Sequence, residues 1–180
     1  MLEKFLLRNK KNASWLKFCN PRFVYTSTDL SEVKMILQEI QTKVEKDGLY
    51  AAGYLSYEAA PAFDPAFIVH DKPILPLLCF GVYEEVEELS TIADDRPSYN
   101  DDLKWTLDTS KDCYEKKFLY IKQQIELGNT YQINYTLRNL ADGITDPYSF
   151  FLAKATHAPF AALIESQEHT IIFASPELFF

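Results

Sequence analysis

Four polar side chains at alternate positions near residue 130 are the groups in this chain whose types and spacing could do chemistry. Residues 128–138 read Gly-Asn-Thr-Tyr-Gln-Ile-Asn-Tyr-Thr-Leu-Arg. Successive side chains of a strand point to opposite faces, so a strand here would have a polar face made of alternate residues: Gln132, Asn134, Thr136 and Arg138. Amide, hydroxyl and guanidinium groups hydrogen-bond in fixed geometries. We therefore predict a strand whose polar face either lines a ligand cavity or belongs to a buried structural network.

The other residue types that commonly carry chemistry lack the spacing of a recognisable site. The cysteines and histidines are scattered along the chain: Cys19, Cys79, Cys113, His70, His157 and His169. Without a Cys-x-x-Cys pair, a disulfide framework or a structural zinc site is not expected. No Ser-His-Asp set can be argued from spacing either. We therefore expect no metal to be bound by this chain and assign no catalytic residue.

Two amphipathic helices are predicted, and a glycine ends each of them. In residues 29–47, apolar side chains recur at helical spacing, Asp29 stands at the N-cap position and Gly48 at the C-terminal stop. Residues 111–127 have the same kind of apolar stripe and are followed by Gly128. The second helix therefore leads the chain directly into the polar strand.

Further strands and one short helix complete the predicted elements. Strands are expected at residues 49–57, 75–83 and 103–107, and a hairpin at residues 160–166 and 170–174. Asp146 followed by Pro147 is a typical helix start, because proline suits the first helical position. Antiparallel strand pairs with interspersed helices indicate an α+β fold.

Charge and hydropathy limit the classes of partner. Of the net charge of −8, residues 84–102 carry eight acids and one base, so this segment is predicted to be a solvated acidic loop. No basic stripe with interleaved aromatic residues indicates nucleic-acid binding. No apolar run approaches the length of a membrane helix, and the N-terminus lacks the order of a secretory signal. A soluble, cytoplasmic protein is expected.

The last residues of the sequence are unusually apolar. The chain ends in Pro-Glu-Leu-Phe-Phe, residues 176–180. Natural termini tend to be polar and mobile. The pattern predicts that the chain is the front part of something longer, or that these residues dock against a partner.

Three segments, taken together and in this order, resemble the chorismate-utilising enzymes. They are Gly-Tyr-Leu-Ser-Tyr-Glu-Ala-Ala-Pro at 53–61, the polar strand at 128–138, and Ala-Pro-Phe-Ala at 158–161 leading to Ala-Ser-Pro-Glu-Leu-Phe at 174–179. Among members of this family, the component I of aminodeoxychorismate (para-aminobenzoate) synthase is the most similar, favoured by the Ser-Tyr-Glu-Ala-Ala-Pro run. Anthranilate synthase component I is the near alternative.

The resemblance implies a fold, a reaction and partners. It implies two orthogonally packed antiparallel sheets with helices outside, of which residues 1–180 would form the N-terminal portion, as one domain or part of one. It implies that chorismate exchanges its 4-hydroxyl for an amino group in folate biosynthesis, with ammonia from a glutamine amidotransferase (glutaminase) subunit. Mg²⁺ would stabilise charge near the leaving hydroxyl, and a lysine nucleophile would divide the displacement into two steps.

This sequence departs from the family where the chemistry is done. The family's lysine lies in a Pro-Ile-Lys-Gly-Thr segment, and no such segment occurs here. The magnesium ligands and catalytic histidine of the family belong to the same C-terminal half. We therefore expect the catalytic half to be absent from the 180 residues, and the chain alone to be inactive and to act as scaffold and docking surface.

The resemblance also indicates an effector site. The Ala-Pro-Phe turn matches the place where relatives bind a regulatory tryptophan between the sheets, so Pro159 and Phe160 are candidate effector residues. The alternative is a packed turn. The family's second effector segment, a Leu-Leu-Glu-Ser-like run, is missing, and only Leu-Leu-Arg-Asn at 6–9 lies near its position. The sequence therefore supplies only one of the two segments that a tryptophan site of this family needs.

Two other functional hypotheses remain open. The chain could derive from anthranilate synthase or another chorismate-utilising synthase, or it could be a non-catalytic ligand-binding or interaction domain that keeps half of the fold. If a sandwich is divided through its middle, one face should expose a contiguous apolar patch. Self-association through such a face is the expected consequence.

Overall fold

The computed structural model describes residues 2–9, 11–92 and 103–178, with the side chain of Glu3 outside that description. Contacts divide the chain into two compact units, Met1–Ser98 with Pro147–Phe180, and Tyr99–Asp146. Both contain antiparallel strands and a helix, so the predicted α+β class is confirmed. None of the helices among the described residues has the length and apolar character needed to cross a membrane.

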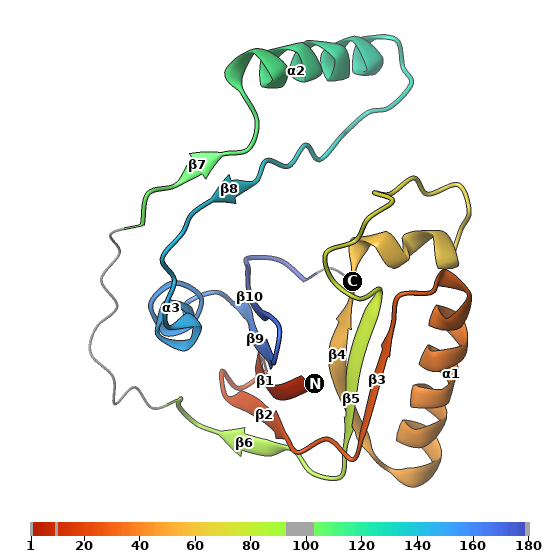
Figure 1. Cartoon of the computed structure of the whole chain (residues 1–180), viewed down its shortest axis with the longest axis vertical. Helices are drawn as coiled ribbons and strands as arrows, with labels where there is room; N and C mark the ends of the chain where they lie inside the picture. The colour runs from red at the N-terminus through yellow and green to blue at the C-terminus, as the bar shows by residue number, and fades with distance from the viewer. Residues whose placement is uncertain (1, 10, 93–102, 179–180) are drawn as a thin grey trace. The chain divides into compact units, whose positions relative to one another are not determined.

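A five-stranded antiparallel sheet forms the first layer of the larger unit (Figure 1). In spatial order its strands are β10 (Thr170–Ser175), β9 (Phe160–Ser166), β1 (Leu2–Arg8), β2 (Trp15–Cys19) and β6 (Glu87–Leu89). The predicted β9–β10 hairpin is confirmed, with Ile171 opposite Ile164. The first and last segments of this unit thus lie side by side, since β1 pairs with β9.

The prediction of an acidic loop at residues 84–102 is wrong at Glu87–Leu89, because these residues form the strand β6. Residues 93–102 lie outside the described part of the chain. Strand β6 pairs with β2, and Glu87 forms an ion pair of 2.7 Å with Lys17. Glu88 accepts a hydrogen bond of 2.6 Å from Asn12 Nδ2 and a second one from the Ser14 hydroxyl. An edge strand has a solvated side where charged residues are common, so acidic composition alone does not exclude a strand.

A three-stranded antiparallel sheet forms the second layer, in the order β3 (Phe23–Ser27), β5 (Leu78–Tyr83) and β4 (Tyr50–Leu55). The helix α1 (Leu30–Asp47) covers one face of it, and its caps are the predicted Asp29 and Gly48. The 3₁₀ helix η1 (Tyr57–Ala62) follows β4. The sheets pack through a shared apolar cluster in which the rings of Phe18 and Tyr83 lie 5.3 Å apart.

The helix α3 (Pro147–Lys154) starts at the predicted proline and covers the other face of the five-stranded sheet. Phe151 and Ala155 are fully buried there. The Phe151 ring meets the Trp15 ring edge-on at 5.5 Å. Because Trp15 lies on β2 and Phe151 on α3, this pair holds the helix against the sheet.

The smaller unit contains the second predicted helix, α2 (Lys111–Glu126), and a two-stranded ribbon of β7 (Thr106–Leu107) and β8 (Asn139–Leu140). Ser110 caps α2 by accepting from the Cys113 N–H at 3.3 Å. Gly128 has φ 75° just after the helix, the left-handed conformation that favours glycine. The helix boundaries therefore agree with the sequence signals.

Candidate functional site

The prediction of a polar strand at residues 128–138 is wrong, because residues 131–138 form no strand and β8 starts at Asn139. The predicted core face is open, with Tyr131 92% and Ile133 44% exposed. A strand needs a neighbour to complete its backbone hydrogen bonds. Among the described residues no strand pairs with this segment. Alternation in a sequence defines two faces but does not supply the partner.

The four polar residues of this segment, Gln132, Asn134, Thr136 and Arg138, are all exposed. The Arg138 guanidinium forms an ion pair of 2.8 Å with Asp108, and the Asp108 N–H donates to the Arg138 carbonyl at 3.1 Å. Hydrogen bonds from Thr109 and Arg138 lower the pKa of the Asp108 carboxyl from its usual value. These contacts join the residue after β7 to the residue before β8, and so stabilise the β7–β8 ribbon. That the four residues border a cavity stays a prediction.

The predicted effector turn lies at the entrance to β9. Pro159 is exposed, and Phe160 begins β9 opposite Ser175 of β10. The Ala158 N–H donates to the Ala155 carbonyl at 3.0 Å, so the turn continues directly from the end of α3. Effector binding by Pro159 and Phe160 stays a prediction, and so does the alternative of a packed turn.

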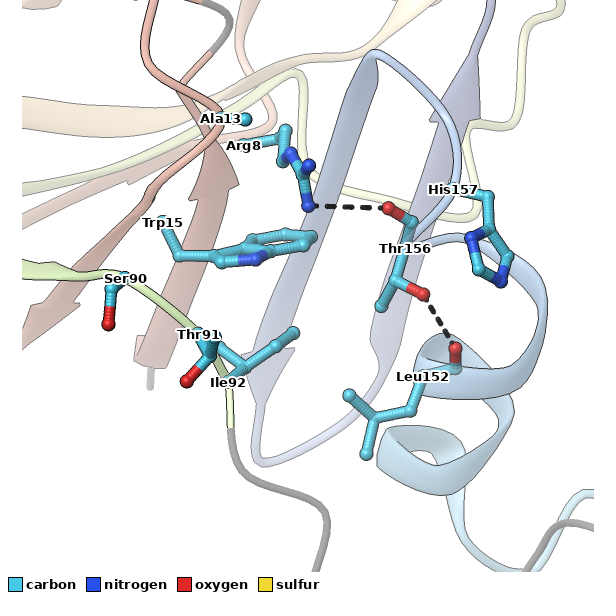
Figure 2. Close-up of a pocket in the computed structure, with 9 residues that line it drawn as sticks. All are labelled: Arg8, Ala13, Trp15, Ser90, Thr91, Ile92, Leu152, Thr156 and His157. Atoms are coloured by element: carbon cyan, nitrogen blue, oxygen red, sulfur yellow. Dashed lines mark hydrogen bonds between the residues drawn. The ribbon is translucent and has the colours of Figure 1, made fainter.

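A pocket of about 600 Å³ lies in the larger unit, where α3 ends beside the five-stranded sheet (Figure 2). Three segments far apart in the sequence line it. The β1–β2 hairpin contributes Arg8, Ala13 and Trp15, the segment after β6 contributes residues 90–92, and the end of α3 contributes Leu152 with residues 156–157. Ligand pockets are commonly of this size.

Arg8 contributes a guanidinium to this pocket. Its guanidinium Cζ lies 5.0 Å from the centroid of the Trp15 ring, within the range of a cation–π contact. Its Nη1 donates to the Thr156 carbonyl at 3.5 Å, a long hydrogen bond (Figure 2). The side chain is half-buried. The ring below and the carbonyl beside it thus hold the guanidinium at the pocket wall.

The rest of the pocket wall is part polar and part apolar. Ile92 and Leu152 belong to the apolar cluster around Trp15, and they supply the apolar surface. The Thr156 hydroxyl donates to the Leu152 carbonyl at 2.8 Å and so continues the last turn of α3 (Figure 2). Ser90 and Thr91 add two exposed hydroxyl-bearing side chains. The pocket can accept a small ligand that has one anionic end and one apolar end.

A second pocket of about 530 Å³ follows β4 and is mainly apolar. It is lined by Leu55, Ser56, Tyr57, Ala59, Ala60, Phe63 and Phe67. Tyr57 is 77% exposed and Phe67 54%. The Ser56 hydroxyl oxygen is buried there and has no hydrogen-bond partner among the described residues. Part of the segment at residues 53–61 therefore lies beside an apolar hollow.

The described residues do not fit a metal ion, since no group of three or more His, Cys, Asp or Glu side chains among them could hold one. The Mg²⁺ implied by the family resemblance therefore has no ligand set in the described part of the chain. No chemical step can be derived through Mg²⁺ from these residues.

Tyr54 connects the two sheets near their ends, with its hydroxyl 3.3 Å from His169 Nε2. Burial raises the pKa of Tyr54 to about 12, and the nearby Cys79 adds to the shift. In the unfolded chain a tyrosine titrates near pH ~10. Between these values the folded state keeps a proton that the unfolded state loses, so stability should fall as pH rises from about 10 to 12.

The change that tests this is Tyr54→Phe, which should make the decline in stability between pH 8 and pH 11 smaller than in the wild type. The measurement is the urea midpoint at both pH values by circular dichroism. Burial also raises the pKa of Tyr25 to about 12, so part of the decline should remain. Equal declines in the variant and the wild type would contradict the role of Tyr54.

The residues that build the Arg8 pocket were not predicted from the sequence as a site. The sequence places Arg8 only in the run near the effector position, and His157 is one of the scattered histidines. Trp15 and Thr156 carried no signal at all. Arg8 and Thr156 are 148 positions apart, and the pairing of β1 with β9 brings them together.

Comparison with known proteins agrees with the resemblance found in the sequence. The family described as chorismate binding enzyme matches residues 3–180. The aminodeoxychorismate synthase component 1 of Klebsiella aerogenes is 34% identical over 77 residues, which cover 42% of this chain and 17% of that protein. No solved structure matches the chain significantly. Because the family match extends over nearly all of its residues, the chain belongs to the chorismate binding enzyme family.

Proposed function

We propose that the chain is the N-terminal portion of a para-aminobenzoate (aminodeoxychorismate) synthase component I. The observation that carries the proposal is the family match over residues 3–180, joined to the similarity to a protein named aminodeoxychorismate synthase component 1. The Ser-Tyr-Glu-Ala-Ala-Pro run at residues 56–61 favours this branch over anthranilate synthesis.

In this proposal the complete enzyme aminates chorismate, and the present residues support that reaction without performing it. The sequence has no Pro-Ile-Lys-Gly-Thr segment, and the described residues hold no metal-binding group. Mg²⁺ and the lysine nucleophile would be supplied by the catalytic half of a complete enzyme. Ammonia would come from a glutamine amidotransferase subunit, and the complex would work in the cytoplasm as part of folate biosynthesis.

The first test reads the encoding gene beyond codon 180. We expect an open frame that continues into a Pro-Ile-Lys-Gly-Thr segment. A stop codon directly after Phe180 would favour the alternative of a non-catalytic ligand-binding or interaction domain. The second test incubates the 180-residue chain with chorismate, ammonium and Mg²⁺. We expect no product, and amination by this chain alone would contradict the proposal.

The identity of the branch is tested on the continued protein. With ammonium as nitrogen source, 4-amino-4-deoxychorismate is the expected product, separated by chromatography and identified by its mass. Anthranilate, which is fluorescent and lacks the pyruvyl group, would instead assign the chain to an anthranilate synthase. The chain of 180 residues serves as the control that lacks the catalytic segment.

The apolar surface after β4 leads to a prediction about self-association. Four exposed apolar residues line the pocket there: Leu55, Tyr57, Phe63 and Phe67. Contiguous apolar surface on a soluble unit favours association. We propose that the isolated chain forms dimers or larger species at high concentration, and that replacing both Tyr57 and Phe67 with serine gives a monomer. Light scattering measures the mass.

Met35→Ser is the matched control for this prediction, because Met35 is 64% exposed on α1, outside the apolar pocket. It should leave the association unchanged. A wild-type chain that stays monomeric at high concentration would contradict the prediction and show that the domain is self-contained.

A further inference from the structure

We propose that the apolar pocket after β4 binds a small neutral aromatic molecule that carries one hydroxyl group. The aromatic body lies against the rings of Phe63 and Phe67, and the hydroxyl group bonds to the side chain of Ser56. This site is separate from the chorismate chemistry proposed above, and the inference does not depend on that function.

The first observation is that the segment at residues 53–61 builds most of this pocket. Five of the seven described lining residues belong to it, namely Leu55, Ser56, Tyr57, Ala59 and Ala60. The two alanines leave space that larger side chains would fill. Ala59 is 1% exposed and packs in one cluster with Val33 of α1, so this side of the pocket is part of the core.

The second observation is a hydroxyl group without a partner. Ser56 stands at the N-cap of η1, where a serine side chain usually accepts from a backbone N–H two or three residues further on. The Ser56 side chain makes no such bond, and its backbone carbonyl accepts from the Ala59 N–H at 3.1 Å. Its hydroxyl oxygen is buried and has no hydrogen-bond partner among the described residues. A buried unpaired hydroxyl is unfavourable, so a ligand that bonds to it gains affinity.

The third observation is that the aromatic walls are held by contacts outside the pocket. The Lys34 Nζ on α1 lies 5.8 Å from the centroid of the Phe63 ring and donates to the Phe63 carbonyl at 3.5 Å. Phe67 ends a turn in which its N–H donates to the Asp64 carbonyl at 3.1 Å. Phe63 is 47% and Phe67 54% exposed, so both rings keep free surface. A ligand ring that covers this surface gains apolar burial and ring–ring contact.

The fourth observation concerns the charge of the ligand. None of the seven described residues that line the pocket has a charged side chain. Lys34 contacts Phe63 but is not among these lining residues. An ionised ligand would lose hydration here without gaining an opposite charge, whereas a neutral ring loses little. Chorismate, which carries two carboxylates, does not fit this pocket, and a neutral aromatic molecule does.

The test uses 2-naphthol as the probe and the full 180-residue chain, at a concentration where light scattering finds a monomer, so that self-association does not compete. Ligand-observed NMR should show saturable binding with a dissociation constant on the order of 0.1–1 mM, as expected for a ligand of this size. 2-Naphthoate, which has the same rings and a negative charge, should bind about tenfold more weakly or less. Naphthalene, which lacks the hydroxyl, should bind roughly three- to tenfold more weakly than 2-naphthol.

Two variants separate the hydroxyl from the aromatic walls. Ser56→Ala should bind 2-naphthol and naphthalene about equally, because the partner of the ligand hydroxyl is gone. Phe67→Ala should weaken both ligands about threefold or more, and Phe67 is exposed enough that folding is not at risk. Ser90→Ala and Met35→Ser lie outside the pocket and are the matched controls, which should bind both ligands like the wild type. Circular dichroism checks that each variant is folded.

Several results would overturn the proposal. They are the absence of saturable 2-naphthol binding, 2-naphthoate that binds as tightly as 2-naphthol, and a loss in Ser90→Ala or Met35→Ser equal to that in Phe67→Ala. A preference for 2-naphthol over naphthalene that survives in Ser56→Ala would contradict the role of the Ser56 hydroxyl. These measurements use neither chorismate nor the continued protein, so their failure is distinct from a failure of the proposed function.

Discussion

Replacing Phe151 with alanine is expected to lower the free energy of unfolding of the larger unit by about 3–5 kcal/mol. The Phe151 side chain has no exposed surface, and its ring packs against Trp15 at 5.5 Å. Alanine would leave a cavity between α3 and the sheet, and a packed core closes such a cavity only in part. The loss therefore combines the missing apolar burial with the unfilled space.

The measurement is urea unfolding followed by tryptophan fluorescence in a Trp105→Phe background, which leaves Trp15 as the single tryptophan. Phe67→Ala is the matched control, because Phe67 is 54% exposed, and it should cost less than about 1 kcal/mol. If Phe151→Ala were no more damaging than Phe67→Ala, the packing of α3 on the sheet would be wrong.

Replacing Gly53 with alanine is expected to destabilise the same unit by about 3 kcal/mol. Gly53 lies on β4 opposite Phe80 of β5. A Cβ added there would overlap the Cys79 carbonyl oxygen and lie 2.6 Å from the Phe80 Cα. These are backbone atoms of the central strand of the sheet, so they cannot move aside as a flexible side chain can. Strands β4 and β5 would have to separate.

Gly48→Ala separates this close approach from the general effect of losing a glycine. Gly48 has φ 67° and open space around its missing Cβ, so alanine there meets only backbone strain of about 1 kcal/mol. Both variants are compared by urea midpoint in the Trp105→Phe background. A smaller loss for Gly53→Ala than for Gly48→Ala would show that β4 and β5 are not this close.

The close approach at Gly53 also gives a physical reason for one residue of the segment that resembles the family. Residues 53–61 begin in β4 and end in η1, and the glycine is required where β4 approaches the backbone of β5. The tyrosines that follow have different roles. Tyr54 meets His169 between the sheets, whereas Tyr57 is exposed beside the apolar pocket.

Elements with local signals were predicted well from the sequence. The helices α1 and α3 begin where a cap and a proline place them, α2 agrees with its predicted range within one residue, and so does the β9–β10 hairpin. Each of these signals is a short-range property: a cap bonds to residues two or three positions away, and a helical stripe repeats within a few turns. All the residues that form such an interaction therefore lie within one short stretch of the sequence.

Two segments whose state depends on a distant partner were predicted wrongly, although the strands β4 and β5 lie within their predicted ranges. The residues at 131–138 alternate as a strand should, but no neighbouring strand pairs with them among the described residues. Conversely, β6 is rich in acids, yet β2 provides a partner and a lysine for its Glu87. Whether a segment becomes a strand is settled by what lies beside it, and that information is not local.

By itself the sequence determined the α+β class, the three helices, the hairpin and membership of the chorismate binding enzyme family, because these follow from local patterns and from motifs read in order. Only the tertiary structure decided where Arg8 lies. The pairing of β1 with β9 brings it to Thr156, 148 positions away, and leaves it without an acidic partner among the described residues. A pocket made of segments so far apart exists only once the sheet has formed.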